Sequence, residues 1–396
     1  MRVLLACGPM HPEPRGVALP GLGLGAGDVT RALAAGWSRA RPADLLTLLP
    51  LPDGGPGSAR AVAAGRVRSR QVLAAPGPLG EPREADLILL EPEAGSRPLD
   101  SEPVARTWFF DAAGIAPLPE DGAVAAREAL EGSTSGLGLA VARALRCTSP
   151  GDSLVIGLAR SAVHDGGAGL LDALGGAAAA RGLMDRRDVV LALADGTALG
   201  GLSGAGQGLS GLADMTPEQA QERDRAACTT ASRLIAGLTA GQGSGALVPR
   251  ADEQPQERTL TVSSWGTGAG GGAAMVLRAL GARGLPGARV MARLLGLEAE
   301  AGGQELLVTA QGEAYDVLAD SVPAVVGQAA VHSALPAVLV TGRSLIPRGE
   351  LAEAGLVSLA ALQPTAAEPA WDEGGSSAIV GRLEAMGQRL ARTWSR

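Results

Sequence analysis

Short apolar runs alternate with helical patterns along almost the whole chain of 396 residues, and this alternation constrains the fold most strongly. Runs typical of strands lie at 3–6, 45–49, 71–74, 86–90, 154–158, 189–193, 260–262, 306–309 and 338–341. Several runs are continuously apolar, as expected for strands that are covered on both faces of a parallel sheet. The sequence therefore predicts an α/β protein with largely parallel sheets, long enough for two domains.

All 34 basic residues are arginines, because the sequence contains neither lysine nor asparagine. A Walker-type phosphate loop, a Schiff base at a lysine amine and a protein-kinase fold each need a lysine, so these classes are excluded. Codon bias in a GC-rich genome explains both missing residues better than selection at a site. The arginines are scattered among 41 acidic residues, which argues against binding to nucleic acid or to a membrane surface.

The three cysteines and three histidines lack the spacing of a metal site, so we expect a reduced, metal-free interior. The apolar stretch at residues 3–6 is too short for a signal peptide and predicts a buried first strand instead. No apolar run reaches the roughly 18 residues that span a bilayer, and we expect a cytoplasmic protein.

Two helices have clear signals in the sequence. Thr216, Pro217 and Gln219 form a capping box at the start of a helix that extends to about Leu238. A helix near the C-terminus carries an apolar stripe that is typical of core packing. Its members are Ile379, Leu383, Met386, Leu390 and Trp394. The polar segment 241–257 between these helices is predicted to be a hinge.

The segment 153–169 combines a strand with a glycine-rich turn, and a helix is expected from Leu170. Backbone amides at such a helix start attract phosphate oxygens. Asp165 in this turn is either a general base and magnesium ligand for phosphoryl transfer or a helix cap. The neighbouring His164 is either an acid–base group or a structural residue.

Two other glycine-rich segments follow predicted strands. Gly266, Gly268 and Gly271 satisfy the GxGxxG pattern of dinucleotide binding, but no acidic residue at a clear second-strand end follows at the expected distance. The turn 51–58 supplies the Asp53 carboxylate and further amides at a strand end, where ligands of open α/β sheets bind, or it is a simple turn before a helix.

In their order along the chain, these segments resemble the bacterial type I glycerate kinase family. The most specific match is that of 159–169 to the family's G-G-S-A-T-N-D-G-G-A-G-M motif. The turn 53–58 matches D-G-G-E-G-T, 135–139 loosely matches G-T-G-E-L, and 266–272 matches G-A-G-A-A-G-G. The stretch 216–225 is similar to T-P-E-x-x-x-E-L-D-R.

The resemblance implies an enzyme that transfers the terminal phosphate of ATP, with Mg²⁺, to D-glycerate or a closely related small hydroxy acid. It implies a discontinuous Rossmann-like domain, 1–70 and 286–396, and a second α/β domain, 71–285, that carries the Asp165 motif. The active site is expected in the cleft between the two domains. Asp165 is the expected catalytic residue, so Asp165→Asn is predicted to abolish turnover and to leave the fold intact.

The resemblance also implies binding roles for other residues. The candidates for substrate binding are Arg15, Arg160, Ser135 and Arg343, and one of the three arginines is expected to bind the substrate carboxylate. The candidates for nucleotide and phosphate binding are Asp53, Gly54, Gly55, Ser58, Ser161, His164, Gly166, Gly167, Gly268, Gly270 and Gly271.

The sequence departs from the family pattern at three places. The lysine of the family's first loop has no counterpart, and Arg15 in an insertion is the nearest cation, although arginine does not replace lysine conservatively at a phosphate site. In the Asp165 motif, Arg160 replaces a glycine and His164 replaces an asparagine. The family's T-G-E-G-R-L-D-x-Q-T motif is eroded at 309–316. Two alternatives therefore stay open: a family member that binds ligand without turnover, and a nucleotide-dependent oxidoreductase.

Overall fold

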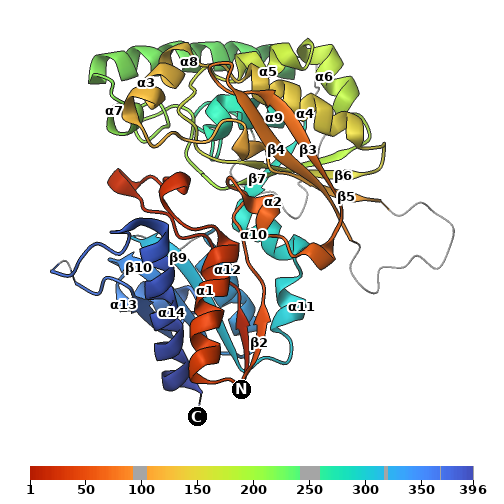
Figure 1. Ribbon diagram of the computed structural model, residues 1–396. Coiled ribbons are helices and arrows are strands. Elements are labelled where there is room, and N and C mark those ends of the chain that lie inside the picture. The colour runs from red at the N-terminus through yellow and green to blue at the C-terminus, as the bar shows by residue number, and fades with distance from the viewer. Residues whose placement is uncertain (92–104, 241–258, 316–319, 366, 396) are drawn as a thin grey trace, which may run out of the picture. The chain divides into compact units, whose positions relative to one another are not determined.

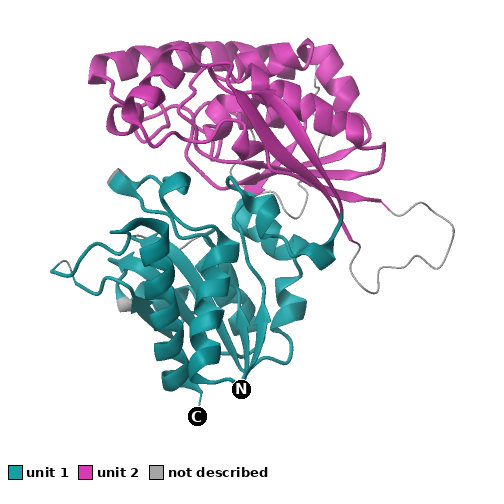
Figure 2. Ribbon diagram, viewed as in Figure 1, with its two compact units in different colours: residues 1–68, 93–95, 286–396 teal, residues 69–92, 96–285 magenta. Residues whose placement is uncertain are grey.

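The computed structural model describes residues 1–91, 105–240, 259–315, 320–365 and 367–395. These residues form two compact units (Figure 2). Unit 1 contains the described residues of 1–68 and 286–395, and unit 2 contains those of 69–285. Each unit has a sheet and a hydrophobic core of its own. The predicted hinge 241–257 lies outside the described residues.

Unit 1 is built on a parallel sheet. In spatial order the strands are β11 (Ser358–Ala361), β10 (Ala337–Ser344), β9 (Leu306–Ala314), β1 (Arg2–Leu5) and β2 (Leu45–Leu48). Its helices are α1 (Ala26–Ala40), α2 (Ser58–Ala61), α10 (Gly287–Leu294), α11 (Leu297–Ala301), α12 (Val322–His332), α13 (Arg348–Glu353) and α14 (Gly375–Trp394). The 3₁₀ turns are η1 (Pro14–Gly16), η2 (Pro20–Leu22) and η3 (Ala64–Arg66).

Both faces of this sheet are covered by helices. Figure 1 shows α1 and α14 side by side on one face, where Val3 and Leu5 contribute to their shared core. Leu4 lies between these two residues in β1 and is equally buried, and α12 packs against β9. The continuously apolar runs of the sequence are explained by this double coverage. Most of the C-terminal apolar stripe is buried against α1, so its assignment to core packing is confirmed.

Unit 2 is built on a mixed sheet. In spatial order the strands are β3 (Val67–Pro76), β4 (Pro82–Leu90), β5 (Thr107–Phe110), β6 (Ser153–Leu158), β7 (Asp188–Leu193) and β8 (Arg283–Pro286). The pairs β5–β6 and β6–β7 are parallel, and β4 is antiparallel to β5. The helices are α3 (Gly122–Glu131), α4 (Ser135–Cys147), α5 (Ala168–Ala173), α6 (Gly176–Met184), α7 (Leu209–Leu212), α8 (Pro217–Thr239) and α9 (Ala273–Ala279), with 3₁₀ turns η4 (Ala112–Gly114) and η5 (Ala269–Gly272).

The structure confirms the α/β class with largely parallel sheets and the capping box of α8, in which Thr216 accepts from the amide of Gln219. The predicted strand at 260–262 is wrong. Thr261 instead begins a turn, because its hydroxyl accepts a hydrogen bond from the Ser263 amide and its own amide donates to the Ser264 hydroxyl. Such side-chain bonds satisfy backbone groups that a strand would need for its ladder.

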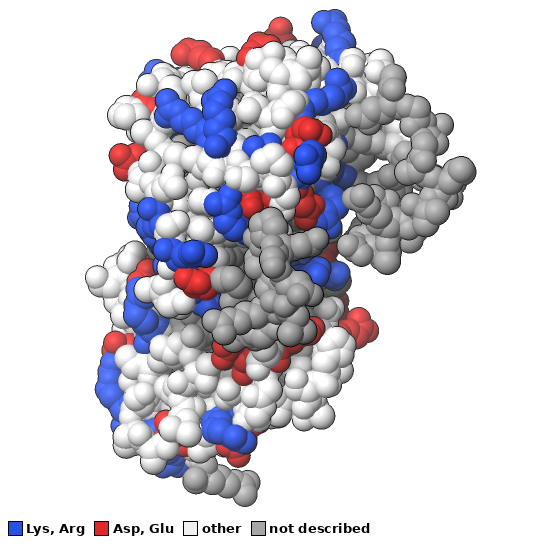
Figure 3. All heavy atoms as spheres, turned by 90° about the vertical axis from the view of Figure 1, so that its right-hand side faces the viewer, with Lys and Arg blue, Asp and Glu red and all other residues white. Residues whose placement is uncertain are grey.

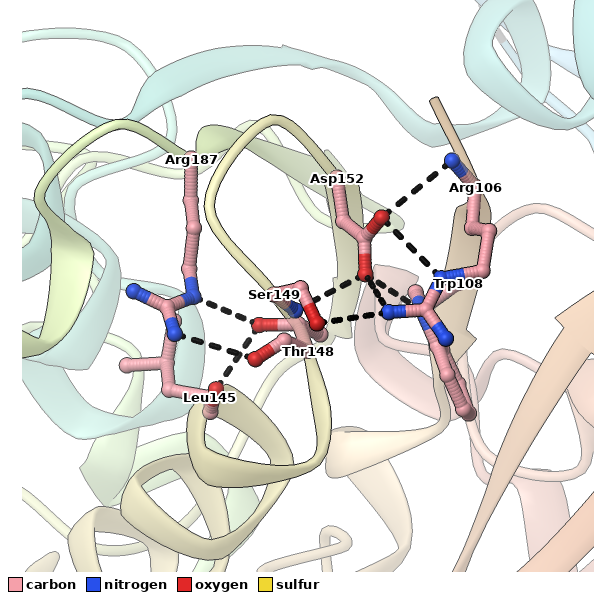
Figure 4. Close-up of polar contacts among 7 residues, drawn as sticks. All are labelled: Arg106, Trp108, Leu145, Thr148, Ser149, Asp152 and Arg187. Atoms are coloured by element: carbon pink, nitrogen blue, oxygen red, sulfur yellow. Dashed lines mark hydrogen bonds and ion pairs between the residues drawn. The ribbon is translucent and has the colours of Figure 1, made fainter. Parts of the chain in front are cut away.

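A buried carboxylate ties together the starts of β5 and β6 (Figure 4). Asp152 accepts hydrogen bonds from the Arg106 guanidinium at 2.8 and 3.2 Å, from the Ser149 amide at 2.8 Å and from the Trp108 indole at 3.2 Å. The Arg106 guanidinium also stacks over the Trp108 ring, 5.7 Å from its centroid. Burial alone raises the pKa of Asp152, but these hydrogen bonds outweigh it and hold the pKa below its usual value.

On the face drawn in Figure 3, arginine side chains are interspersed with aspartate and glutamate side chains. Among the described residues, no helix is both long enough and apolar enough to cross a membrane.

We predict that Asp152→Asn lowers the free energy of unfolding at pH 7 by roughly 1–2 kcal/mol, since Arg106 is partly screened by solvent. Because folding lowers the pKa, the stabilisation is complete above the unfolded pKa of about 3.9 and is lost as the pH falls through the folded pKa. Urea unfolding at pH 7 and pH 3 measures both effects, with the exposed Asp172→Asn as control. An equal loss at both pH values would contradict the role assigned to the charge.

Candidate active site

Asp165 lies in the turn between β6 and α5, and its carboxylate is a centre of hydrogen bonding. Oδ1 accepts from the Gly167 amide at 2.9 Å, and Oδ2 accepts from the amides of Thr134 at 2.8 Å and Gly169 at 3.2 Å. The Thr134 hydroxyl lies 3.0 and 2.9 Å from the two oxygens and in turn accepts from the Leu170 amide at 2.9 Å. The carboxylate therefore joins the N-terminal ends of α4 and α5.

This geometry is that of the helix-cap interpretation. Negative charge at a helix N-terminus satisfies amides that have no partner within the helix and interacts favourably with the helix dipole. The Gly167 amide, which the resemblance assigns to phosphate, donates to Asp165 instead. Asp165 is only partly buried.

The two glycine-rich segments of unit 2 pack directly against each other. The Gly270 amide donates to the Ala159 carbonyl at 2.8 Å, which joins η5 to the end of β6. Gly167 and Gly272 are in van der Waals contact, since a Cβ on Gly167 would lie 2.7 Å from the Gly272 carbonyl oxygen. Both glycines also have positive φ, so no other residue fits at either position. Residues 159–169 and 266–272, together with the start of α9, therefore form one compact turn region.

The dinucleotide interpretation of Gly266, Gly268 and Gly271 lacks its structural context. A GxGxxG loop binds a pyrophosphate between a strand and the helix that follows it. Here the preceding segment is the turn at 261–264, and the Gly268 amide donates to the Thr197 carbonyl at 3.0 Å. The GxGxxG pattern therefore no longer supports the oxidoreductase alternative.

Two candidates of the Asp165 motif, Arg160 and His164, already have acidic partners. The Arg160 guanidinium bonds Thr197 at 2.8 Å and Asp195 at 3.4 Å. His164 is buried, and its Nε2 lies 3.2 Å from Asp224 Oδ1. This pairing favours the structural interpretation of His164, because the same Asp224 carboxylate also accepts from Gln207 at 3.1 Å.

The remaining candidates of unit 2 lie around the same turns. The Ser161 hydroxyl is buried and accepts from the Val163 amide at 3.3 Å. Ser135 is the first residue of α4, and its amide donates to the Ser133 hydroxyl at 3.1 Å. Gly166 has a φ of +68° and is buried beside Asp165.

Arg223 on α8 is a site residue that the sequence prediction missed. Its Nε is buried and has no hydrogen-bond partner in the described structure. Burial lowers the pKa of Arg223, while the charge of Asp165 opposes that shift, so the two side chains lie within electrostatic range. The sequence held a signal, because Arg223 stands where the family's E-L-D-R stretch has leucine.

In unit 1, the candidates lie at the carboxyl ends of the parallel strands. The Asp53 carboxylate follows β2 and accepts from the Gly55 amide at 2.9 Å, and the Ser58 hydroxyl donates to the Gly55 carbonyl at 2.6 Å. Gly54 has a φ of +91°, which completes this tight turn. Arg15 belongs to η1 in the insertion after β1.

Arg343 at the end of β10 is paired with an acid, like Arg160. Its Nη2 lies 2.7 Å from Glu313 Oε2, and its guanidinium stacks over Tyr315 and bonds its hydroxyl. Glu313 also accepts from Trp371 Nε1 at 3.4 Å. A substrate carboxylate at Arg343 would compete with this buried glutamate.

Two further titratable residues of unit 1, Glu13 and His11, lie within electrostatic range of Asp53 and were not among the predicted site residues. Burial, followed by the charges of Glu313 and Asp53, raises the pKa of Glu13 to about 7. Burial lowers the pKa of His11, although the charge of Asp53 opposes the shift. Neither residue belongs to a motif, so no pattern in the sequence indicates them.

The sequence profile of the glycerate kinase family matches residues 23–203 and 215–395. The chain belongs to the glycerate kinase family. Two relatives, each named an uncharacterized protein, from Mycobacterium bovis and Mycobacterium tuberculosis, are 29% identical over 338 residues, covering 85% of this chain and 80% of theirs. A glycerate kinase of Halalkalibacterium halodurans is 30% identical over 145 residues, 37% of this chain and 34% of that protein.

The family assignment agrees with the fold. A solved structure named "putative glycerate kinase 2 from Salmonella typhimurium" aligns with a TM-score of 0.64 and 23% identity, covering 99% of this chain and 98% of the other. The resemblance stated from the sequence is thus confirmed at the level of family and fold, and this membership indicates a kinase-like enzyme. The site residues and the cleft between domains stay predictions.

We predict that Glu13→Gln raises the free energy of unfolding at pH 8 and has little effect at pH 4. Because folding raises the pKa of Glu13, its stabilising contribution is complete below the unfolded value of about 4.3 and is lost as the pH rises through about 7. Chemical denaturation at both pH values measures the difference, with the exposed Glu353→Gln as control. A variant that is less stable than the native protein at pH 8 would refute this assignment.

Proposed function

We propose that this protein is an ATP-dependent kinase of D-glycerate or a closely related small hydroxy acid. Family membership over most of the chain supports the reaction class. The observation that carries the location is the buried, unpartnered Nε of Arg223 beside Asp165, next to the paired glycine-rich turns of unit 2. A buried guanidinium nitrogen without an acceptor is costly, and an anionic ligand that accepts from it removes that cost.

The donor chemistry of this region fits the phosphates of ATP. Arg160 and Arg343 are paired with Asp195 and Glu313, whereas the buried Nε of Arg223 has no acceptor among the described residues, so Arg223 is the preferred candidate cation. The helix N-terminal ends add dipoles that favour phosphate oxygens, while the amides of Thr134, Gly167 and Gly169 themselves donate to Asp165. We therefore assign Arg223 to phosphate binding, in a chain that lacks the lysine of its family.

Asp165 has two tasks in this proposal. Its hydrogen bonds to the amides of Thr134, Gly167 and Gly169 fix the turn beside the phosphates. The partly exposed Asp165 side chain also orients the hydroxyl group that accepts the phosphoryl group. Phosphoryl transfer depends mainly on positioning and on neutralising charge, so a strong general base is not required.

ATP supplies the phosphoryl group, and Mg²⁺ neutralises charge on its phosphates. No cluster of three metal-ligating side chains occurs among the described residues. Mg²⁺ in kinases is commonly held by one or two carboxylates together with the phosphates themselves, so a single carboxylate fits this requirement. Asp165 is the carboxylate at this site that would hold it.

Asp165→Asn is a poor test on its own, because the variant loses structural hydrogen bonds as well as a charge. Arg223→Gln is sharper, since the Nε of Arg223 has no partner to lose. We predict that Arg223→Gln lowers kcat/KM for magnesium-ATP and D-glycerate by about tenfold or more, with an unchanged melting temperature. ADP release measures turnover, and Arg225→Gln, an exposed position on the same helix, is the control.

Three outcomes separate the alternatives. Glycerate-dependent ADP release that falls in Arg223→Gln and not in Arg225→Gln supports the proposal. Turnover that is equal in both variants would place the phosphate site elsewhere. ATP binding without turnover, across a panel of hydroxy acids, would support a family member that binds ligand and has lost catalysis.

A further inference from the structure

A surface pocket of about 550 Å³ lies between α10, α11 and α12 in unit 1. Its volume is within the usual range for small-molecule sites, roughly 300–1,000 Å³. None of the residues proposed above for phosphoryl transfer lines this pocket. Its apolar wall includes Ala292, Leu297, Val325 and Ala329.

Two pairs of polar side chains line the pocket from different helices. Arg289 and Arg293 are four residues apart on α10, and Gln328 and His332 are four residues apart on α12. Residues with this spacing share one face of a helix, so each helix presents two donors to the same space.

Three of these four side chains have no partner. Arg293, Gln328 and His332 make no side-chain hydrogen bond or ion pair with the described residues. Arg289 is paired with Asp320 at 2.9 Å, which leaves part of its guanidinium free because each arginine carries five donors. Glu298 is the acidic residue of the lining, and Asp320 balances the charge of Arg289 from outside it, so Arg293 is the arginine of the lining without an acidic partner among the described residues.

We propose that this pocket binds a compact organic phosphate, with the phosphate at the donors and the carbon body against the apolar wall. A carboxylate has two oxygens, whereas a phosphate monoester has three terminal oxygens and up to two negative charges. Arginine also binds phosphate bidentately. The number of donors therefore matches phosphate better than carboxylate.

Phenyl phosphate is a suitable probe, because it joins a phosphate to a compact apolar ring. Titration calorimetry is carried out on Arg223→Gln, in which binding at the proposed nucleotide site is weakened. We predict saturable binding that weakens about tenfold when Arg293→Gln is added, the loss of about one charge-assisted hydrogen bond. Arg392→Gln on α14, an exposed position in the same unit, is the matched control and leaves binding unchanged.

Benzoate and inorganic phosphate distinguish the parts of the ligand. Both are expected to bind more weakly than phenyl phosphate, since each lacks either the phosphate or the apolar body. Absence of saturable phenyl phosphate binding, or binding unaffected by Arg293→Gln, would overturn the proposal. Benzoate binding as tight as that of phenyl phosphate would overturn the assignment to phosphate. None of these results depends on whether the protein is a glycerate kinase.

Discussion

The arrangement of unit 2 around its glycine-rich turns depends on the carboxylate of Asp165. Its two oxygens accept from three backbone amides and from the Thr134 hydroxyl, and they thereby hold the N-terminal ends of α4 and α5 together. The segment 266–272 then packs against this turn, where Gly167 and Gly272 leave no room for side chains. A carboxylate in such a position determines where amides and dipoles point, and these are the groups on which phosphoryl transfer relies.

The distribution of arginine partners supports the proposal that Arg223 offers phosphate a cation in a chain without lysine. Arg160 and Arg343 are each bonded to acids, so their charge is largely satisfied within the protein. Arg223 stands where the family stretch on α8 has leucine, and its buried Nε has no acceptor among the described residues. Arginine also binds phosphate in a fork rather than as a point charge, so the geometry of binding differs from that of a lysine.

Much of the fold could be predicted from the sequence, because parallel strands with two covered faces are continuously apolar and the capping box marks the start of α8. The strand at 260–262 was predicted wrongly, since Thr261 and Ser264 divert its backbone into a turn. At the site, the turn around Asp165 was found through its motif, but spacing could not show that the carboxylate accepts from Thr134, a residue 31 positions away. No local pattern could indicate the other candidates. The assignments of Arg223, Glu13 and His11 rest on burial and on neighbours that are distant in the sequence.

The account places the phosphates of ATP at the glycine-rich turns of unit 2 and beside Arg223. Hydrogen–deuterium exchange with and without magnesium-ATP tests this placement directly, because bound phosphate slows the exchange of amides around it. The account predicts slower exchange in peptides that cover 159–169, 217–225 and 266–272. Unchanged exchange in these peptides at saturating magnesium-ATP, with slower exchange confined to other segments, would contradict it.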